Sequence, residues 1–444
     1  MLITFQTTGY IPTRTIDNIE FMSMRCIVIG AGITGLSASL ELLKRGWDVV
    51  IIEAKDRMGG RIYTIPLKNT TLTVEGGAEF IHGEMPLTTT LLKDANVGWR
   101  AAAGNPYRIQ DGQLQQQEFF DEEWSLLLQK LKQVRRDMSF ADFLQQNFQS
   151  EKFSALRSRV KQFVEGYNAA SIEEASALAL RDEWSKDEDP TQFRPEGGYG
   201  NLVNILAREV ASLGGDIRLA EVVEAIDWQS GRVNVRTRSG GTHEGSKALI
   251  TVPIGVLQQS SIRIYPDLPE YFSAAKKIGF GSVVKFHLAF SQPFWEKNEA
   301  RKMEDLGFLF SDQRVPTWWT QRPNPVPLLT GWLGGPAVND LPREEEKLLN
   351  LAITSLSNLF SFPKNKLQDL LVASNVINWS ADPFSCGAYS YVTLATPEAK
   401  NRLNTPVANT LYFAGEALDE GPNTGTVEAA LSSANLATGK IASP

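Results

Sequence analysis

The clearest hydrophobic pattern lies near the start of the chain, where two short apolar runs flank a helical repeat. Residues 26–29 and 49–52 are continuous apolar runs, which is typical of strands buried on both faces of a sheet. Between them, apolar residues recur from Ile33 to Leu43 at the spacing of one helix face. The pattern predicts a strand, a helix that packs on the sheet, and a second strand.

The spacing of apolar residues divides the rest of the chain into two regions that leave the first predicted sheet and two segments that return to it. The first of these regions, residues 91–190, has mainly helical spacing. The second, residues 256–376, contains a strand predicted over 282–290, in which Lys285 and His287 share one face and apolar residues share the other. Further strands and helices are predicted at 202–213, 217–226, 233–238, 248–253, 411–414 and 429–438.

Composition narrows the class of protein. A chain of 444 residues, 42% hydrophobic and 21% charged, is long enough for about two or three globular domains. The net charge of −7 argues against nucleic acid as the main partner and suits a cationic substrate.

Few residues are available for disulfides or metal binding. Two cysteines, Cys26 and Cys386, cannot form a disulfide framework, and the three histidines lack ligand spacing, so no metal is expected. No apolar run is long enough to span a membrane, and residues 1–24 lack the pattern of a secretory signal. We therefore expect a cytoplasmic protein with a short N-terminal arm.

A glycine motif connects the first predicted strand to the first predicted helix. Gly30, Gly32 and Gly35 form G-x-G-x-x-G, and Glu53 ends the second strand. The first glycine permits a tight turn, the second lets the backbone approach a pyrophosphate, and the third permits close packing of helix and strand. Glu53 would accept hydrogen bonds from an adenosine ribose. In this context the motif predicts a dinucleotide site, for either NAD or FAD.

Three further motifs are rich in small residues. Gly59 and Gly60 precede Arg61, whose guanidinium suits a phosphate, and residues 75–83 combine glycines with Glu79 and His82. A second strand ends in Gly415-Glu416, and residues 425–428 then open the helix predicted over 429–438. An NAD enzyme has no evident need for this second strand-to-acid unit.

Taken together, the motifs closely resemble the flavin-dependent amine oxidase family, which includes monoamine, polyamine and L-amino acid oxidases and the lysine-specific histone demethylases. The resemblance covers roughly residues 25–440. It rests on an ordered set at 30–35, 53, 59–61, 77–78, 198–200, 248–253, 285, 379, 389 and 415–416.

The resemblance implies an α/β fold with a Rossmann-like FAD domain built from three separate segments. These segments are 25–90, 195–255 and 377–444, and residues 91–194 and 256–376 would form an inserted substrate domain of mixed sheet and helices. The implied FAD contacts are Gly30, Ala31, Gly32, Thr34, Gly35, Glu53, Ala54, Arg57, Gly59, Gly60, Arg61, Gly77, Ala78, Val223, Val252, Trp379, Gly415, Glu416, Thr426 and Val427.

The resemblance also implies catalytic roles. Lys285 matches the lysine that holds a water against flavin N5, and Tyr389 matches one aromatic wall of the amine site. The opposite wall position is Thr426, where monoamine oxidases carry tyrosine and animal-type polyamine oxidases carry threonine. His82 matches a substrate-contacting histidine of polyamine and spermine oxidases, and Phe80 stands where L-amino acid oxidases place a carboxylate-binding arginine.

Acidic residues could hold a distant ammonium of a polycation. Glu79, Glu183, Asp187 and Glu188 are the candidates, although the run 182–189 is by default a solvated loop. Trp332 is a further expected substrate contact. FAD is expected to be non-covalent, because Ala388 replaces the cysteine that attaches FAD in monoamine oxidases. The extra modules of the histone demethylases are not recognisable, so a chromatin role is not expected.

The sequence therefore predicts an FAD-dependent oxidase of spermidine-like or spermine-like amines that releases H₂O₂. An oxidase of monoamines or L-amino acids is the nearest alternative. A desaturase or isomerase of apolar substrates on the same fold, or a flavoprotein without turnover, are alternatives of another class.

Overall fold

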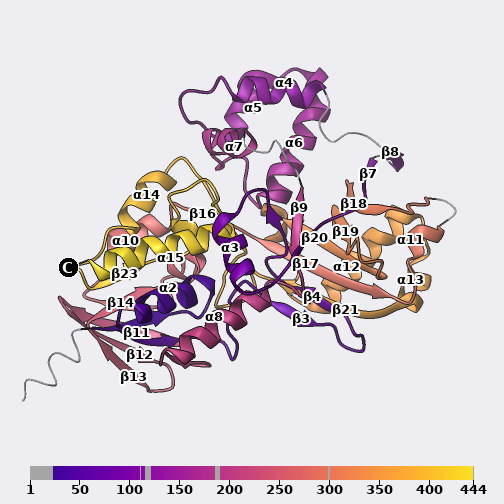
Figure 1. Ribbon diagram of the computed structural model, residues 1–444. Coiled ribbons are helices and arrows are strands. Elements are labelled where there is room, and N and C mark those ends of the chain that lie inside the picture. The colour runs from indigo at the N-terminus through magenta and orange to yellow at the C-terminus, as the bar shows by residue number, and fades with distance from the viewer. Residues whose placement is uncertain (1–23, 111, 116–121, 186–190, 299–300, 444) are drawn as a thin grey trace, which may run out of the picture.

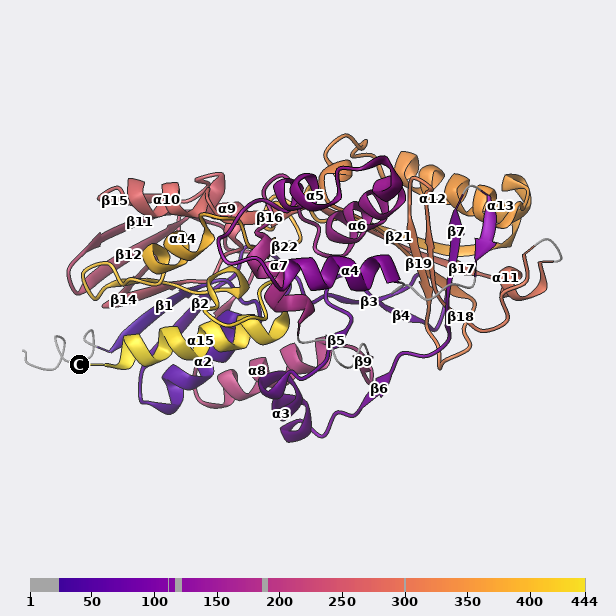
Figure 2. The same ribbon diagram turned by 90° about the horizontal axis from the view of Figure 1, so that it is seen from above.

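The computed structural model describes residues 24–110, 112–115, 122–185, 191–298 and 301–443. Within them, a parallel sheet and a mainly antiparallel sheet lie at opposite ends of an elongated molecule, and a helical lobe projects beside the junction (Figure 1, Figure 2). Asp187, Glu188 and residues 1–23 of the expected arm lie outside the described residues.

The parallel sheet gathers strands from distant parts of the chain. Its order is β10 (Asp216–Arg218), β2 (Asp48–Ile52), β1 (Arg25–Ile29), β14 (Lys247–Ile250) and β23 (Leu411–Phe413). Alternate residues enter two cores, so Cys26 and Val28 face one side and Ile27 and Ile29 the other. Three helices cover the first side: α2 (Ile33–Lys44), α8 (Gly200–Ser212) and α15 (Val427–Ala442).

A second sheet and three helices cover the other side. The strands are β13 (Thr242–Gly245), β12 (Arg232–Thr237), β11 (Val223–Gln229) and β15 (Arg263–Tyr265), and the helices are α9 (Ile254–Gln258), α10 (Pro269–Ala275) and α14 (Thr396–Leu403). Residues 256–278, which the sequence groups with the substrate region, thus pack on the parallel sheet. The run predicted over 217–226 is divided between β10 and β11.

The mainly antiparallel sheet has seven strands. Their order is β21 (Leu371–Asn378), β17 (Val283–Phe290), β20 (Leu328–Gly334), β19 (Thr317–Thr320), β18 (Leu306–Ser311), β7 (Asn105–Gln110) and β8 (Gln113–Gln115). The last two belong to the region predicted as mainly helical. One face packs on α11 (Phe294–Lys297), α12 (Glu345–Phe360) and α13 (Lys364–Leu370). Lys285 lies on the opposite face, because β17 alternates as predicted.

The helical lobe and several short elements complete the molecule. The lobe contains α4 (Glu122–Leu131), α5 (Phe140–Phe148), η1 (Glu151–Phe153), α6 (Ser154–Tyr167) and α7 (Ala177–Trp184) around its own apolar core. The short elements are β3 (Thr64–Pro66), β4 (Thr73–Glu75), β5 (Ile81–His82), α3 (Pro86–Asp94), β6 (Trp99–Ala101), β9 (Gln192–Pro195), β16 (Gly279–Gly281), η2 (Pro336–Val338), β22 (Tyr389–Tyr391) and η3 (Glu416–Leu418). The predicted α/β class, with a second region of mixed sheet and helices, is confirmed.

The contact between α2 and β1 gives a stability prediction. A Cβ on Gly35 would lie 2.0 Å from the Gly30 carbonyl oxygen, so the helix must shift to admit one. We expect Gly35→Ala to lower the free energy of unfolding by about 1–3 kcal/mol in chemical denaturation. The matched control is Gly439→Ala in α15, where no atom lies within 4 Å of the added Cβ. Equal stability of the two variants would contradict the close packing at Gly35.

Candidate active site

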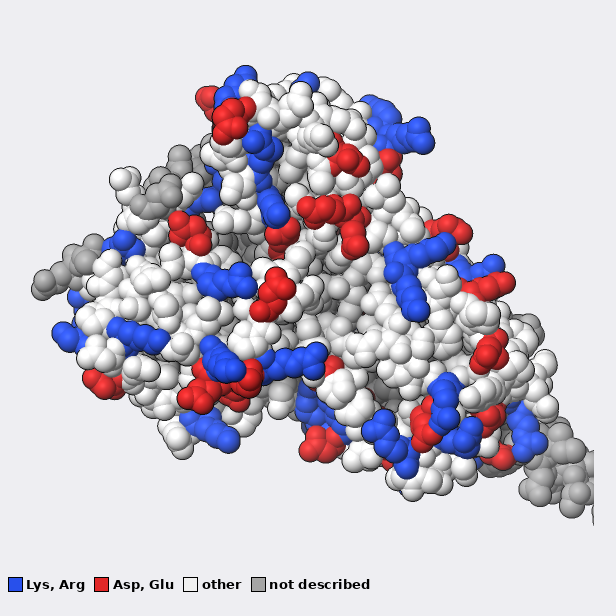
Figure 3. All heavy atoms as spheres, turned by 180° about the vertical axis from the view of Figure 1, so that it is seen from behind, with Lys and Arg blue, Asp and Glu red and all other residues white. Residues whose placement is uncertain are grey.

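One large cavity runs between the two main sheets and beneath the helical lobe. Its volume is about 2800 Å³, well above the ordinary range for a pocket that holds one small ligand. On the face seen in Figure 3, the surface is hollowed below the lobe and acidic side chains lie at the edge of the hollow. The volume allows a dinucleotide and a substrate to lie together.

The glycine turn after β1 forms one end of the cavity. Gly30 has a φ of 110°, a conformation that favours glycine, and a Cβ on Gly32 would have no atom within 4 Å. The Glu53 carboxylate is buried and accepts hydrogen bonds from the backbone N–H groups of Ala31 (2.7 Å) and Lys55 (2.9 Å). Glu53 also lines the cavity, so its remaining lone pairs suit the hydroxyls of a ribose.

A second wall of the cavity is built from residues between β2 and β5 and from Trp379, which is distant in the sequence. A Cβ on Gly77 would lie 1.7 Å from the Arg61 carbonyl oxygen, so this position requires glycine. The Trp379 indole N–H donates to the Gly76 carbonyl at 3.0 Å, which anchors the ring against the same stretch. Gly59, Gly77 and Trp379 all line the cavity.

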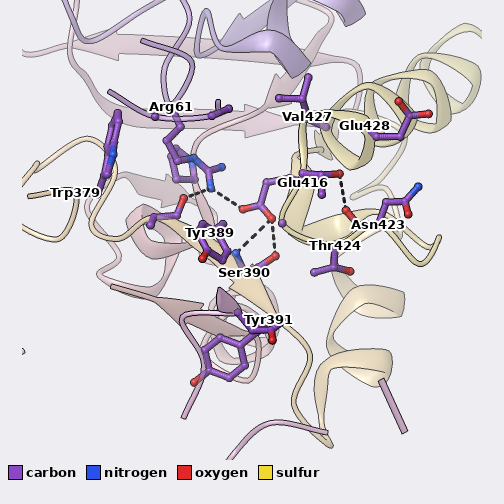
Figure 4. A pocket seen from close by; sticks show the side chains of 18 of the residues that line it. Arg61, Trp379, Tyr389, Ser390, Tyr391, Glu416, Asn423, Thr424, Val427 and Glu428 are labelled. Carbon is purple, nitrogen blue, oxygen red and sulfur yellow. Dashed lines mark hydrogen bonds and ion pairs between the residues drawn. The ribbon is translucent and has the colours of Figure 1, made fainter. Parts of the chain in front are cut away.

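An ion pair joins this wall to the C-terminal segment (Figure 4). The Arg61 guanidinium donates to Glu416 Oε1 at 2.6 Å and to the Ala388 carbonyl at 2.8 Å. The other Glu416 oxygen accepts from the Ser390 hydroxyl and backbone N–H. Side chains separated by more than 300 residues thus hold this part of the cavity in one shape.

Most of the predicted cofactor contacts meet at the cavity. The lining includes Gly30, Gly32, Thr34, Glu53, Ala54, Gly59, Gly60, Arg61, Gly77, Ala78, Val223, Val252, Trp379, Gly415, Glu416, Thr426 and Val427. Ala31, Gly35 and Arg57 lie behind this surface within the described part of the chain. The Arg57 guanidinium donates to the Gly60 carbonyl at 3.0 Å and stacks on the Tyr63 ring, so it braces the loop.

Lys285 lies on the cavity wall with a carboxylate partner. Its side chain is 1% exposed, and Nζ lies 2.6 Å from Glu79 Oε2. The other Glu79 oxygen accepts from Arg194 Nε and from the Trp319 indole, each at 2.9 Å. Both oxygens are therefore bonded to protein donors, and the use of Glu79 as a ligand for a substrate ammonium stays a prediction.

The predicted amine site gathers aromatic groups around the C-terminal end of α6. The Tyr389 hydroxyl donates to the Tyr167 carbonyl, and the Trp332 indole donates to the Gly166 carbonyl at 2.8 Å. The Tyr167 hydroxyl lies 3.3 Å from His82 Nδ1. Burial lowers the pKa of His82 to about 4, so its imidazole is neutral at physiological pH.

Glu183 is the predicted substrate acid that reaches this site. Both of its oxygens accept from the Asn168 side-chain amide, at 2.9 and 3.0 Å, and it lines the cavity. Asn168 follows Tyr167, whose carbonyl accepts from the Tyr389 hydroxyl, so Glu183 is bonded to the residue next to this contact. Burial, Tyr167 and the negative charge of Glu183 all raise the pKa of Tyr389. Thr426 also lines the cavity, but its hydroxyl caps α15 by accepting from the Ala429 N–H.

A row of aromatic rings continues from Tyr389 along the cavity. Successive ring centroids lie 6.0–6.3 Å apart through Trp332, Trp319, Phe308 and Phe310. Sequence reasoning missed most of this row, together with Arg194, Tyr167 and Asn168. Strand alternation in 317–320 could have singled out Trp319, whereas no local signal marks Arg194, which meets Glu79 from 115 residues away.

The comparisons decide the family. Residues 33–442 match the family described as flavin containing amine oxidoreductase. The chain belongs to this family. FAD is the cofactor, and the glycine turn, the buried Glu53 and the cavity volume fit it.

Among the relatives of this amine oxidoreductase, polyamine oxidase 2 of Arabidopsis thaliana is 27% identical over 90% of this chain and 84% of the relative. Lysine-specific histone demethylase 1 homolog 3 of the same plant is also 27% identical, over 93% of this chain, which spans 29% of that relative's length. A structure of putrescine oxidase bound to putrescine superimposes with a TM-score of 0.75 at 18% identity, over 94% of this chain and 98% of the other. This last likeness shows the fold.

Membrane-spanning helices and groups of metal ligands are both absent from the described residues. None of the described helices has both the length and the apolar composition needed to cross a membrane. Within the same residues, no three His, Cys, Asp or Glu side chains are grouped to hold a metal ion.

The open space at Gly32 gives a prediction about cofactor affinity. A methyl group there would enter the cavity where the turn should meet the pyrophosphate, without touching the rest of the protein. We expect Gly32→Ala to weaken FAD binding about tenfold or more in titrations of the apoprotein. The melting temperature of the apoprotein should match that of the Gly439→Ala control. Unchanged FAD affinity would place the pyrophosphate elsewhere.

The residues near Tyr389 predict how the flavin is attached. Ala388 lines the cavity, whereas Cys386 lies outside the lining of the described chain and its thiol contacts the Pro383 carbonyl. We expect acid precipitation of the holoenzyme to release all of the FAD into the supernatant. A yellow pellet that retains flavin after washing would show a covalent bond.

Proposed function

We propose that this chain oxidises polyamines such as spermidine or spermine, with O₂ as the electron acceptor and H₂O₂ as a product. The observation that carries the proposal is the bond from Glu183 to Asn168, the residue after the Tyr167 that Tyr389 contacts, at the end of an aromatic-lined cavity. A carboxylate there suits a substrate that carries a second positive charge some distance from the nitrogen being oxidised.

The reaction needs a dry site and a fixed amine. The carbon beside the reacting nitrogen loses a hydride, and water then cleaves the resulting imine into an aldehyde and an amine. FAD, when bound, takes the two electrons of the hydride and passes them to O₂, which leaves with two protons as H₂O₂. Tyr389 and Trp332, stacked with ring centroids 6.3 Å apart, would exclude water beside the amine.

The charge distribution around α6 supports a cationic substrate. The C-terminal end of a helix carries a partial negative charge, and α6 ends at Tyr167 beside Tyr389 and Trp332. Glu183 adds a full negative charge at this place, while His82 is neutral and would not repel an ammonium. His82 can instead accept a hydrogen bond from it.

The aromatic row supports a long substrate. Polyamines alternate ammonium groups with short methylene chains, and aromatic faces bind both through apolar contact and cation–π attraction. The row from Tyr389 to Phe310 gives such a chain a continuous surface. The likeness to a relative named polyamine oxidase, which covers most of both chains, agrees with this reading.

Specific residues weigh against the nearest alternatives. An L-amino acid would bring a carboxylate to Phe80, where the neighbouring Arg194 is already bonded to Glu79 and lies over the Phe80 ring. A monoamine would leave Glu183 without a role. An apolar desaturase or isomerase substrate would also leave Glu183 without a role. We further propose a cytoplasmic location, since both described cysteines are free.

A peroxide assay across amines tests the proposal. We expect H₂O₂ release with spermidine or spermine, weaker release with putrescine, and little with tyramine or leucine. Activity restricted to tyramine would favour a monoamine oxidase, and activity restricted to leucine an amino acid oxidase. If none of these amines gave H₂O₂, the oxidase proposal would be wrong.

Removal of the Glu183 charge tests how the second ammonium is held. We expect Glu183→Gln to raise KM for spermidine about tenfold or more, because a charge-assisted contact is lost, while kcat changes little. KM for a slow monoamine should not change. Glu209→Gln, a carboxylate lost from the exposed face of α8, is the control for a change of charge alone. Equal KM changes for spermidine and the monoamine would contradict this role.

A further inference from the structure

Side chains from β17, β9, β19 and the stretch before β5 form a cluster at the cavity wall. Lys285 Nζ contacts Glu79 Oε2 at 2.6 Å and the Gly77 carbonyl at 3.2 Å. An ammonium carries three donors, and these two acceptors engage two of them. Lys285 lines the cavity, so its third donor is available to what the cavity holds.

Glu79 stands between two cations. Its second oxygen accepts from Arg194 Nε and the Trp319 indole, each at 2.9 Å, and the Arg194 side chain is fixed by the carbonyls of Thr320 and Arg322. The side chains of Lys285 and Glu79 are 1% and 5% exposed. The carboxylate is therefore held by donors on both sides and is almost sealed from solvent.

The two cations keep this carboxylate ionised. Although burial acts in the opposite direction, Lys285 and Arg194 lower the pKa of Glu79 to about 2. Two other titratable groups face the cluster. Burial raises the pKa of Glu75 to about 7, so this carboxyl gains its charge near neutral pH, but it accepts from Thr64 and the Tyr199 N–H instead of from Lys285. Burial and Lys285 lower the pKa of His287 to about 3, so its imidazole is neutral.

Without the carboxylate, Lys285 would face Arg194 inside the protein. Burial and a neighbouring like charge both favour the neutral form of a lysine. The guanidinium cannot lose its proton under ordinary conditions, so Lys285 is the group that would. The positive charge would then remain only on Arg194, on the far side of Glu79 from Lys285.

We propose that Glu79 is a positioning residue that keeps Lys285 protonated and fixed on the cavity wall, where its positive charge faces the bound flavin. A positive charge there favours addition of electrons to the flavin. The inference rests on the proposed function only through the bound FAD. It can be tested without any amine, so its failure and the failure of polyamine oxidation are distinguishable.

The test is the reduction potential of the bound flavin, measured on the holoenzyme against a reference dye from about pH 6 to about pH 9. We expect the wild type and Glu79→Gln to diverge as pH rises, because the Lys285 ammonium of the variant has lost its carboxylate partner. At the alkaline end, the ratio of reduced to oxidised flavin at a fixed dye potential should be about tenfold or more lower in the variant. A constant difference across the range would overturn the proposal.

Four further variants separate positioning from a structural effect. Glu79→Asp keeps the charge and should restore most of the wild-type pH profile. Glu209→Gln, which removes a carboxylate from the exposed face of α8, should follow the wild type. Lys285→Met should lower the potential at every pH without adding a pH dependence, and Glu79→Gln/Lys285→Met should likewise add no pH dependence.

Lys285→Met also keeps the test decisive if Glu79→Gln does not fold, since the Glu79–Arg194 pair remains in that variant. A potential equal to that of the wild type would show that the Lys285 charge does not act on the flavin. That result would overturn the proposal, whatever the peroxide assay gives.

Discussion

A buried lysine needs a buried counter-charge, and this requirement links the two halves of the structure. An ammonium removed from water is tolerated only when it is paired and hydrogen-bonded. Lys285 belongs to the seven-stranded sheet, whereas Glu79 belongs to the stretch that follows the parallel sheet and its glycine turn. Their contact brings the face of one sheet to the cofactor end of the other.

A further polar contact lies at the same junction, where the Trp379 indole, just after β21 of the seven-stranded sheet, bonds to the Gly76 carbonyl. Arg61 bonds to Glu416 at the parallel-sheet end, since both residues follow strands of that sheet. The apolar residues are instead divided among separate cores around each sheet and within the helical lobe. The cavity of about 2800 Å³ lies between these cores, and its walls combine the polar contacts with packed aromatic rings such as Trp332 and Tyr389.

Sequence alone predicted the parts whose signals are local. The glycine turn and Glu53 follow from one strand-helix-strand unit, and the position of Lys285 follows from alternation within a single strand. The family resemblance supplied the cofactor, which the family match confirms. These features depend on short stretches whose conformation is largely set by their own residues.

The remaining features depend on which distant segments meet in the fold. No single stretch of the sequence specifies these long-range contacts. The bonds from Arg194 and Trp319 to Glu79 could not be predicted, because these partners come from strands far along the chain. The bond from Arg57 to the Gly60 carbonyl, which braces the loop, was not predicted either. Strands β7 and β8 were missed because β7 pairs with the distant β18, and this pairing is decided by tertiary contact, while β8 pairs with β7.

The central claim is that this cavity holds FAD with a polyamine beside it. The most direct measurement mixes the holoenzyme with spermidine or spermine in the absence of O₂ and follows the visible absorption of the flavin. The account predicts that the yellow colour bleaches with at least one of these amines and returns when air is admitted. A flavin spectrum that stays oxidised with both amines would contradict it.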